Sequence, residues 1–149
     1  MDRQQDIINH AEEQCREHGS RLTEKRKKVL SGLLQSERAL SAYELADYYK
    51  ETYGESLPTM SVYRILDFLE GEQLVHKLNL ANRYVACVHI TCDHKHEVSQ
   101  FLICTNCQRV KEINISKSTL ATLRRNVEEA GFQLITPQLE MNCLCAECA

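Results

Sequence analysis

The 149-residue sequence has no apolar run close to the roughly 20 residues that a membrane span needs. No signal peptide is recognisable at its N-terminus, and there is no internal repeat and no low-complexity tract. We therefore expect a soluble, cytoplasmic protein with no membrane partner. The length allows one ordinary domain or two very small ones, and a hydrophobic content of 43% is enough to bury a core.

The sequence also lacks the excess of basic residues that nucleic-acid-binding domains often carry. Its net charge is -3, and residues 1–86 hold 12 Lys and Arg against 14 Asp and Glu. The segment "RLTEKRKK" departs from this balance, because Arg21, Lys25 and the three cations at 26–28 accompany a single acid, Glu24. A solvated helix face and a DNA-binding patch both explain such a cluster.

Cysteine, in contrast, is abundant: there are eight, and seven lie at or beyond position 87. A reducing cytoplasm disfavours disulfides, so metal binding is the first explanation and redox sensing the second. The strongest pattern is a repeated C-x-x-C, formed by Cys104 with Cys107 and by Cys145 with Cys148. Two such pairs predict a closed, structural zinc site that ties the C-terminus to the middle of its domain. Thioredoxin-like chemistry would instead need one pair at the start of a helix.

Hydrophobic periodicity divides the chain into two parts. Four helices are expected: about 3–18, after the N-cap Thr23, from a Ser41/Glu44 capping box, and over 59–71, where Thr59 can act as cap. The period then changes to two, and "LVHKLNL" and "RYVAC" predict a hairpin. After a loop come the strands "SQFLIC" and "VKEIN", a helix over about 117–130, and a last strand, "FQLITPQLEMN", in which Pro137 indicates an edge or a bulge.

Helices followed by a two-stranded wing are typical of a winged helix-turn-helix. The fold class is therefore α+β, with a small α/β unit after the winged domain. We expect a DNA-binding domain over 1–87, a hinge loop over 88–97, and a dimerisation and metal-binding domain over 98–149, stapled by the four-cysteine zinc site.

The helix over 59–71 has the composition of a recognition helix. Its apolar residues follow the spacing of a buried face, which leaves Thr59, Ser61, Tyr63 and Arg64 near its start for other contacts. Hydroxyl groups suit phosphates, and an Arg side chain can donate two hydrogen bonds to a guanine. Alternatively, Tyr63 packs on a neighbouring helix and Arg64 pairs with an acid of its own helix, Asp67 or Glu70.

Four further residues are candidates for a second tetrahedral site: His76 in the first wing strand, Cys87 at the end of the second, His96 in the following loop and Glu112 in a later strand. Each has a simpler interpretation, as an exposed wing residue, a small buried residue or a surface charge. The loop "CVHITCDHKHE" is nevertheless dense in metal-binding side chains, and His94 or His89 could replace His96 as the ligand.

The segments "RLTEKRKKVL", "SAYELADYY", "PTMSVYRILDFLEGEQLVHK", "YVAC", "FLICTNCQRVKEIN" and "CAEC" resemble the ferric uptake regulator family, and within it the zinc uptake regulators. The resemblance covers nearly the whole chain. It implies a homodimer that binds a double-stranded, palindromic operator and represses zinc-uptake and homeostasis genes when Zn²⁺ is bound. A thiolate from Cys87 in the sensing site favours zinc over ferrous iron or manganese.

The resemblance also assigns residues, with two Zn²⁺ ions expected per subunit. The structural site is Cys104, Cys107, Cys145 and Cys148. The regulatory site is His76, Cys87, His96 and Glu112. Tyr43, Tyr63 and Arg64 match positions that face DNA, and the full set expected to bind DNA is Arg21, Lys25, Tyr43, Thr59, Ser61, Tyr63 and Arg64.

Other signals remain open within the same fold, namely iron, manganese, or oxidation of Cys15, Cys92 and Cys143, which lie outside both expected sites. If the last strand continues, Cys143 lies on the same face as Cys145 and packs beside the zinc without binding it. An enzyme with a small-molecule substrate is not expected, because a four-cysteine site leaves no open coordination position and no nucleophile–base pair is recognisable.

Overall fold

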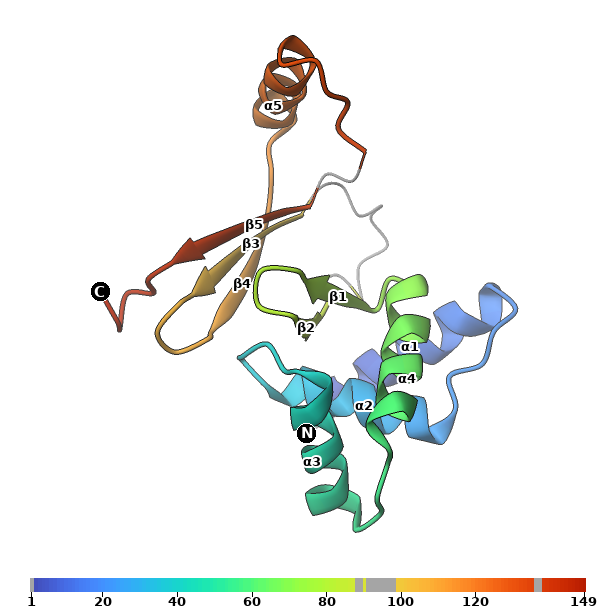
Figure 1. Cartoon of the computed structure of the whole chain (residues 1–149). Helices are drawn as coiled ribbons and strands as arrows, with labels where there is room; N and C mark the ends of the chain where they lie inside the picture. The colour runs from blue at the N-terminus through green and yellow to red at the C-terminus, as the bar shows by residue number, and fades with distance from the viewer. Residues whose placement is uncertain (1, 88–89, 91–98, 136–137) are drawn as a thin grey trace. The chain divides into compact units, whose positions relative to one another are not determined.

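The structure is a computed structural model that describes residues 2–87, 90, 99–135 and 138–149 (Figure 1). The described residues form five helices and five strands. They divide into two compact units, residues 1–93 and 94–149. The range expected as a hinge, 88–97, lies outside the described residues except for Ile90. No described helix is long and apolar enough to cross a membrane.

The first unit contains the four expected helices: α1 (Asp2–Glu17), α2 (Glu24–Gln35), α3 (Ala42–Tyr53) and α4 (Thr59–Gly71). The predicted caps of α2 and α3 are confirmed, because Thr23 accepts a hydrogen bond from the backbone of Arg26 and both bonds of the Ser41/Glu44 capping box are present. The predicted cap of α4 is wrong. Pro58 occupies that position, and a proline side chain offers no acceptor.

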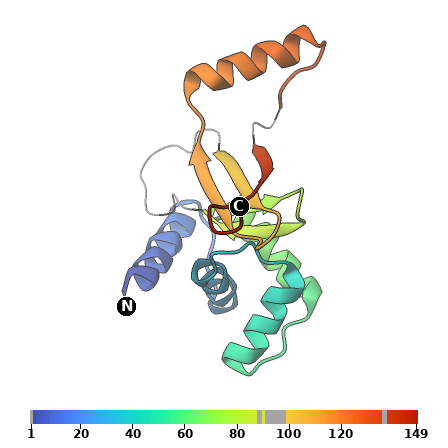
Figure 2. The ribbon, with the colours of Figure 1, turned by 90° about the vertical axis from the view of Figure 1, so that its left-hand side faces the viewer.

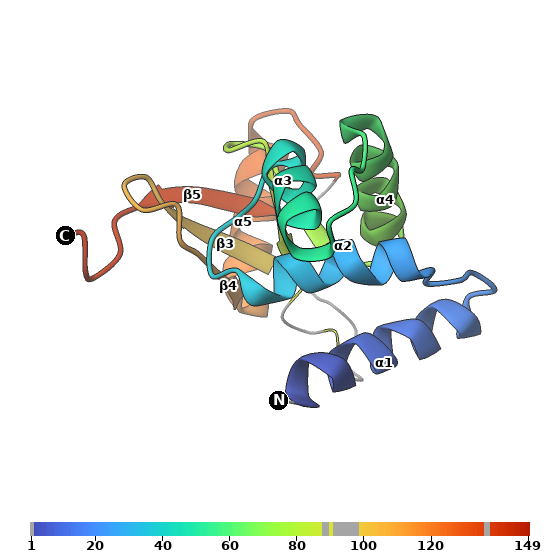
Figure 3. The same ribbon diagram turned by 90° about the horizontal axis from the view of Figure 1, so that it is seen from below.

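Each helix of the first unit turns an apolar face toward one shared core. Figure 3 shows α1 beside α2, with α3 and α4 on the opposite side of α2. On α4, Val62, Ile65, Leu66 and Leu69 are all buried, which confirms the predicted buried face. Burial of each such side chain contributes about 1.5–3 kcal/mol, so this face fixes the orientation of α4 and thereby determines which residues point outward.

A two-stranded wing follows α4. Strands β1 (Val75–Leu78) and β2 (Arg83–Ala86) pair antiparallel. Tyr84 and Leu40 exchange two backbone hydrogen bonds of 2.8 and 3.0 Å, which join β2 to the connection between α2 and α3. The guanidinium of Arg83 pairs with Glu44 of the capping box. The wing is therefore attached to the start of α3, and the winged helix-turn-helix is confirmed.

The second unit is a three-stranded sheet with one helix (Figure 2). Strand β3 (Ser99–Cys104) is central, pairing antiparallel with β4 (Val110–Asn114) and parallel with β5 (Leu139–Cys143). Helix α5 (Lys117–Glu129) connects β4 to β5. The predicted last strand began too early, because Phe132 and Ile135 are exposed and lie outside any strand. Pro137 lies outside the described residues.

Candidate metal centres and DNA-binding surface

The two C-x-x-C pairs converge at one end of the sheet of the second unit. Cys104 is the last residue of β3, and the parallel register places it opposite Cys143, the last residue of β5. The turn after β3 and the tail after β5 therefore leave the sheet at the same end (Figures 1 and 3). Because the first pair starts that turn and the second pair occupies that tail, sheet topology brings the two pairs together.

The four-cysteine cluster has the dimensions of a zinc site. The Sγ atoms of Cys104, Cys107, Cys145 and Cys148 all lie within 4.8 Å of one another. The Sγ atoms of Cys107 and Cys145 are 3.8 Å apart. A regular tetrahedron with Zn–S bonds of about 2.3 Å has edges of about 3.8 Å, so the cluster fits a tetrahedral zinc thiolate centre. The predicted four-cysteine cluster is confirmed.

Tight backbone turns hold the cysteines in place. The amide of Gln108 donates to the carbonyl of Cys104 at 3.0 Å, and the amide of Cys148 donates to the carbonyl of Cys145 at 3.0 Å. The backbone of Gln108 is left-handed, with φ of 64°. The two turns also touch each other, since the amide of Cys145 lies 3.5 Å from the Sγ of Cys104. The backbone of both turns therefore surrounds the four thiols.

Hydrogen bonds to sulfur prepare part of the cluster for a cation. Backbone amides of Cys107 and Cys145 lower the pKa of the Cys104 thiol to about 6 despite its burial. A hydrogen bond with the Cys148 thiol lowers the pKa of Cys145. At Cys148 a hydrogen bond with Asn106 lowers the pKa, but the neighbouring thiols and burial raise it to about 11. Zinc binds cysteine as the thiolate, so binding of a zinc ion here would release the thiol protons that the four side chains share in hydrogen bonds.

Cys143 stays outside this cluster. Its side chain is half-buried, and its thiol contacts the carbonyl of Met141 at 3.7 Å. Strand β5 ends at Cys143, so the expected strand alternation does not extend to Cys145, which instead begins a turn. The expectation that Cys143 and Cys145 share a strand face is therefore wrong.

The wing hairpin places two of the four residues expected in the regulatory site close together. His76 lies opposite Val85 in the β1–β2 register, and the amide of Cys87 donates to the carbonyl of Leu74 at 2.9 Å. His76 and Cys87 are thus diagonal neighbours on one face of the hairpin. A ring nitrogen of His76 and the Sγ of Cys87 lie within 4.8 Å. His76 is half-buried, and Cys87 is only 3% exposed.

Of the other two expected ligands, the structure describes Glu112 but not His96. Glu112 lies on β4 of the second unit, is half-buried and accepts a hydrogen bond of 2.7 Å from the Ser99 hydroxyl. His96, like the alternatives His94 and His89, lies outside the described residues, as does Cys92. The complete regulatory site therefore stays a prediction.

The four residues of α4 that are expected to read DNA differ in how exposed they are. Arg64 is exposed, and within the described parts of the chain it forms no ion pair with Asp67 or Glu70. Tyr63 is half-buried and packs against the core, so its alternative packing role is partly realised. Thr59 and Ser61 are half-buried. An unexpected residue is Met60, whose exposed fraction is 65%.

The basic segment of α2 is largely used in contacts inside the first unit. The guanidinium of Arg26 lies 3.7 Å from the centroid of the Phe68 ring, and the Lys28 ammonium lies 4.7 Å from that of Tyr53. Lys27 pairs with acids of α1 and of its own helix. Three of the five cations of this segment, Arg26, Lys27 and Lys28, are therefore engaged in contacts that hold the unit together. Outside α4, the expected DNA-binding residues Arg21, Lys25 and Tyr43 are exposed.

Together, the fold and the four-cysteine cluster define a metal-binding winged-helix protein. The sequence pattern of the ferric uptake regulator family matches residues 17–142. A zinc uptake regulation protein of Escherichia coli (strain K12) is 34% identical over 144 residues, which cover 97% of this chain and 82% of that protein. The chain therefore belongs to the ferric uptake regulator family, whose members are dimeric transcription regulators and not enzymes.

Solved structures agree with this assignment. A zinc uptake regulator complexed with zinc and DNA has a TM-score of 0.85 and 32% identity, over 98% of this chain and 95% of that one. The crystal structure of holo XcZur has a TM-score of 0.78 and 34% identity, over 96% of both chains. The likeness thus covers both units.

Proposed function

We propose that the protein is a zinc-responsive transcriptional repressor, which binds a palindromic operator as a homodimer when Zn²⁺ is bound and controls zinc-uptake genes. The observation that carries this proposal is the His76–Cys87 pair within the wing hairpin, whose ligand atoms lie within 4.8 Å. A nitrogen and a thiolate sulfur favour zinc over ferrous iron or manganese. The similarity to a regulator solved with zinc and DNA supports the same metal and the same partner.

Two Zn²⁺ ions per subunit have different roles in this proposal. The four cysteines of the second unit hold the structural ion, which contributes to folding. His76, Cys87, His96 and Glu112 hold the regulatory ion, with ligands from both units of the chain. A zinc ion bound there supplies a link between the wing and the second unit. It acts by favouring the DNA-competent arrangement over others, which is a population shift.

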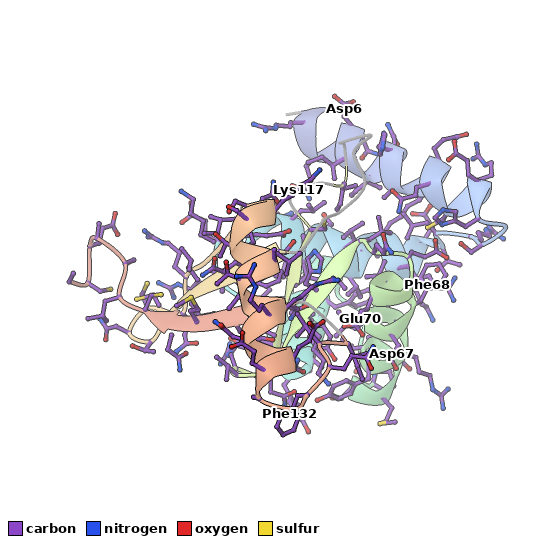
Figure 4. The ribbon with its side chains drawn as sticks, turned by 90° about the horizontal axis from the view of Figure 1, so that it is seen from above. Asp6, Asp67, Phe68, Glu70, Lys117 and Phe132 are labelled. Carbon is purple, nitrogen blue, oxygen red and sulfur yellow. The ribbon has the colours of Figure 1, made fainter. Side chains whose placement is uncertain are left out.

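Homodimer formation is supported by apolar side chains of the second unit. No residue of α5, all of which is described, is buried in the single chain. Leu120, Leu123 and Val127 follow helical spacing on α5. Beyond its end, Phe132 and Ile135 are 73% and 87% exposed. Figure 4 labels Phe132. A second copy of this unit would cover them. A dimer would place two α4 helices in successive major grooves, about 34–36 Å apart.

The first experiment finds the operator and tests the metal. The full-length protein with zinc selects duplexes from a random DNA pool, and fluorescence anisotropy then measures binding to the selected duplex as free zinc is titrated. We expect tight binding with zinc and at least a tenfold loss after mild chelation that leaves the structural ion in place. Equal binding in both states, or stronger binding with iron or manganese, would contradict the proposal.

A matched pair of buried cysteines tests the regulatory site. Cys87 and Cys15 are both buried in the first unit, at 3% and 0% exposure. Cys87→Ser should weaken the zinc response strongly, whereas Cys15→Ser should change stability only. Retention of the full zinc response in the double variant Cys87→Ser/His96→Ala would reject the site assignment while leaving zinc-dependent repression itself intact.

Thiol oxidation is the alternative signal. Burial raises the pKa of the Cys15 thiol, which makes this residue a poor sensor. Cys143 is half-buried beside the four-cysteine cluster and is the more accessible of the two. Loss of DNA binding under mild peroxide at constant free zinc, prevented by Cys143→Ser, would favour this alternative.

A further inference from the structure

Met60 lies at the centre of the outward face of α4. At 100° per residue, the buried residues Val62, Ile65, Leu66 and Leu69 define one side of the helix. The positions opposite this side are Met60, Arg64, Asp67 and Gly71. Met60 and Arg64 are one helical turn apart on this stripe, so their side chains are neighbours on the surface.

Met60 has a large apolar side chain that is exposed to solvent. Its exposed fraction is 65%, although the helix buries a complete apolar face elsewhere. Tyr63, in contrast, lies at the side of the helix and packs partly against the core. Met60 is therefore better placed than Tyr63 to contact something that approaches α4 head-on together with Arg64.

The charges along α4 favour contact with an anionic partner only in the first half of the helix. There is no acid in the first turn of α4, whereas Asp67 and Glu70, labelled in Figure 4, lie in its second half. Phosphates would be repelled from the acidic half. Pro58, at the cap, leaves the first backbone amides of α4 without a side-chain acceptor within the described residues. An anionic partner is thus favoured at the Met60 end.

We propose that Met60 reads the C5-methyl group of a thymine in the major groove, beside the guanine contacted by Arg64. This inference rests on the proposed function. The thymine methyl is the one apolar group that a base pair presents in the major groove, and a flexible, polarisable methionine fits such a group well. Four residues of helix span about 6 Å, which corresponds to about two base-pair steps of 3.4 Å.

The test uses the selected operator and the full-length, zinc-loaded protein. Each thymine is replaced singly by uracil, which lacks the methyl group, and binding is compared for the wild type and Met60→Ala. Each guanine is likewise replaced singly by 7-deazaguanine. The guanine contacted by Arg64 is the one whose replacement weakens binding of the wild type but not of Arg64→Ala. Met141→Ala, at an exposed methionine of the second unit (46%), is the matched control.

For the wild type we expect one uracil substitution per half-site, about two base pairs from that guanine, to weaken binding about fourfold, the effect of one buried methyl. Met60→Ala should remove this sensitivity, and Met141→Ala should keep it. Two outcomes would overturn the inference: an operator with no methyl-sensitive thymine, or unchanged sensitivity in Met60→Ala. Absence of zinc-dependent DNA binding altogether would instead reject the proposed function.

Discussion

Cys143 and Cys148, both within the last seven residues, provide a sharp test of the proposed structural zinc site. Cys148 belongs to the four-thiol cluster, whereas Cys143 lies outside it, and its thiol contacts the Met141 carbonyl. Both are half-buried. Because serine has nearly the volume of cysteine, the variants Cys148→Ser and Cys143→Ser differ mainly in whether a thiolate ligand is lost.

The expected magnitude follows from the cluster. Structural zinc sites contribute about 10–16 kcal/mol of binding free energy, so each of four thiolates accounts for about 2.5–4 kcal/mol. Cys148→Ser should therefore weaken zinc binding by about two to three orders of magnitude. Cys143→Ser loses one weak contact at 3.7 Å, and its zinc affinity should stay within about twofold of the wild type.

Competition with a chromophoric chelator measures the affinity, and thermal melting reports the stability of the second unit. That unit buries few large apolar side chains among its described residues: Phe101, Ile103 and Ile115. Cys148→Ser should consequently lower its melting temperature as well as its zinc affinity. Equal zinc loss in the two variants, or none in Cys148→Ser, would refute the assignment of the fourth ligand.

Three further predictions concern the first unit. Arg64→Ala should weaken operator binding by about 1–3 kcal/mol per half-site in an anisotropy titration, whereas Asp67→Ala on the same helix face should not weaken it. Burial raises the pKa of Glu44, but hydrogen bonds from Ser41 and the charge of Arg83 outweigh it, so the pKa is net lowered from 4.5. This carboxylate therefore stabilises the fold above pH 4.5, and the stabilisation is lost as pH falls through the lowered value. Glu44→Gln should cost about 0.5–1 kcal/mol in urea unfolding of the metal-free protein at pH 7, and the difference should vanish in acid. Finally, Cys15 is 0% exposed, so mass spectrometry should find it unmodified by a thiol reagent under native conditions and modified in denaturant.

The four-cysteine cluster could be predicted from sequence because the pattern of each pair is local. A C-x-x-C segment sets its own geometry, and two copies suffice for a tetrahedron. The way the copies meet could not be predicted, since it depends on the parallel pairing of β3 with β5, which aligns Cys104 with Cys143. The predicted last strand also began too early, because it included Phe132 and Ile135, which are apolar but exposed. Periodicity alone does not distinguish residues of a core from apolar residues on an uncovered surface.

The basic segment of α2 shows the same limit in electrostatics. Its five cations look alike in sequence, but Lys27 pairs with Glu12 of α1, and Arg26 stacks on Phe68 of α4. Both partners are distant in the chain. Sequence therefore indicates that cations gather here, whereas only tertiary structure separates those held inside the unit from those left exposed, Arg21 and Lys25.

This separation bears on how the proposed repressor can be switched. Non-specific DNA affinity comes mainly from cations that neutralise phosphates. Residues 1–86 hold 12 cations against 14 acids, and three cations of the basic segment are engaged internally. We therefore expect one winged-helix unit to attract DNA only weakly. Useful affinity then requires two units bound at once, and the gain depends on whether their spacing matches the two half-sites. A metal that favours the matching arrangement can therefore control DNA binding without any change in the reading residues themselves.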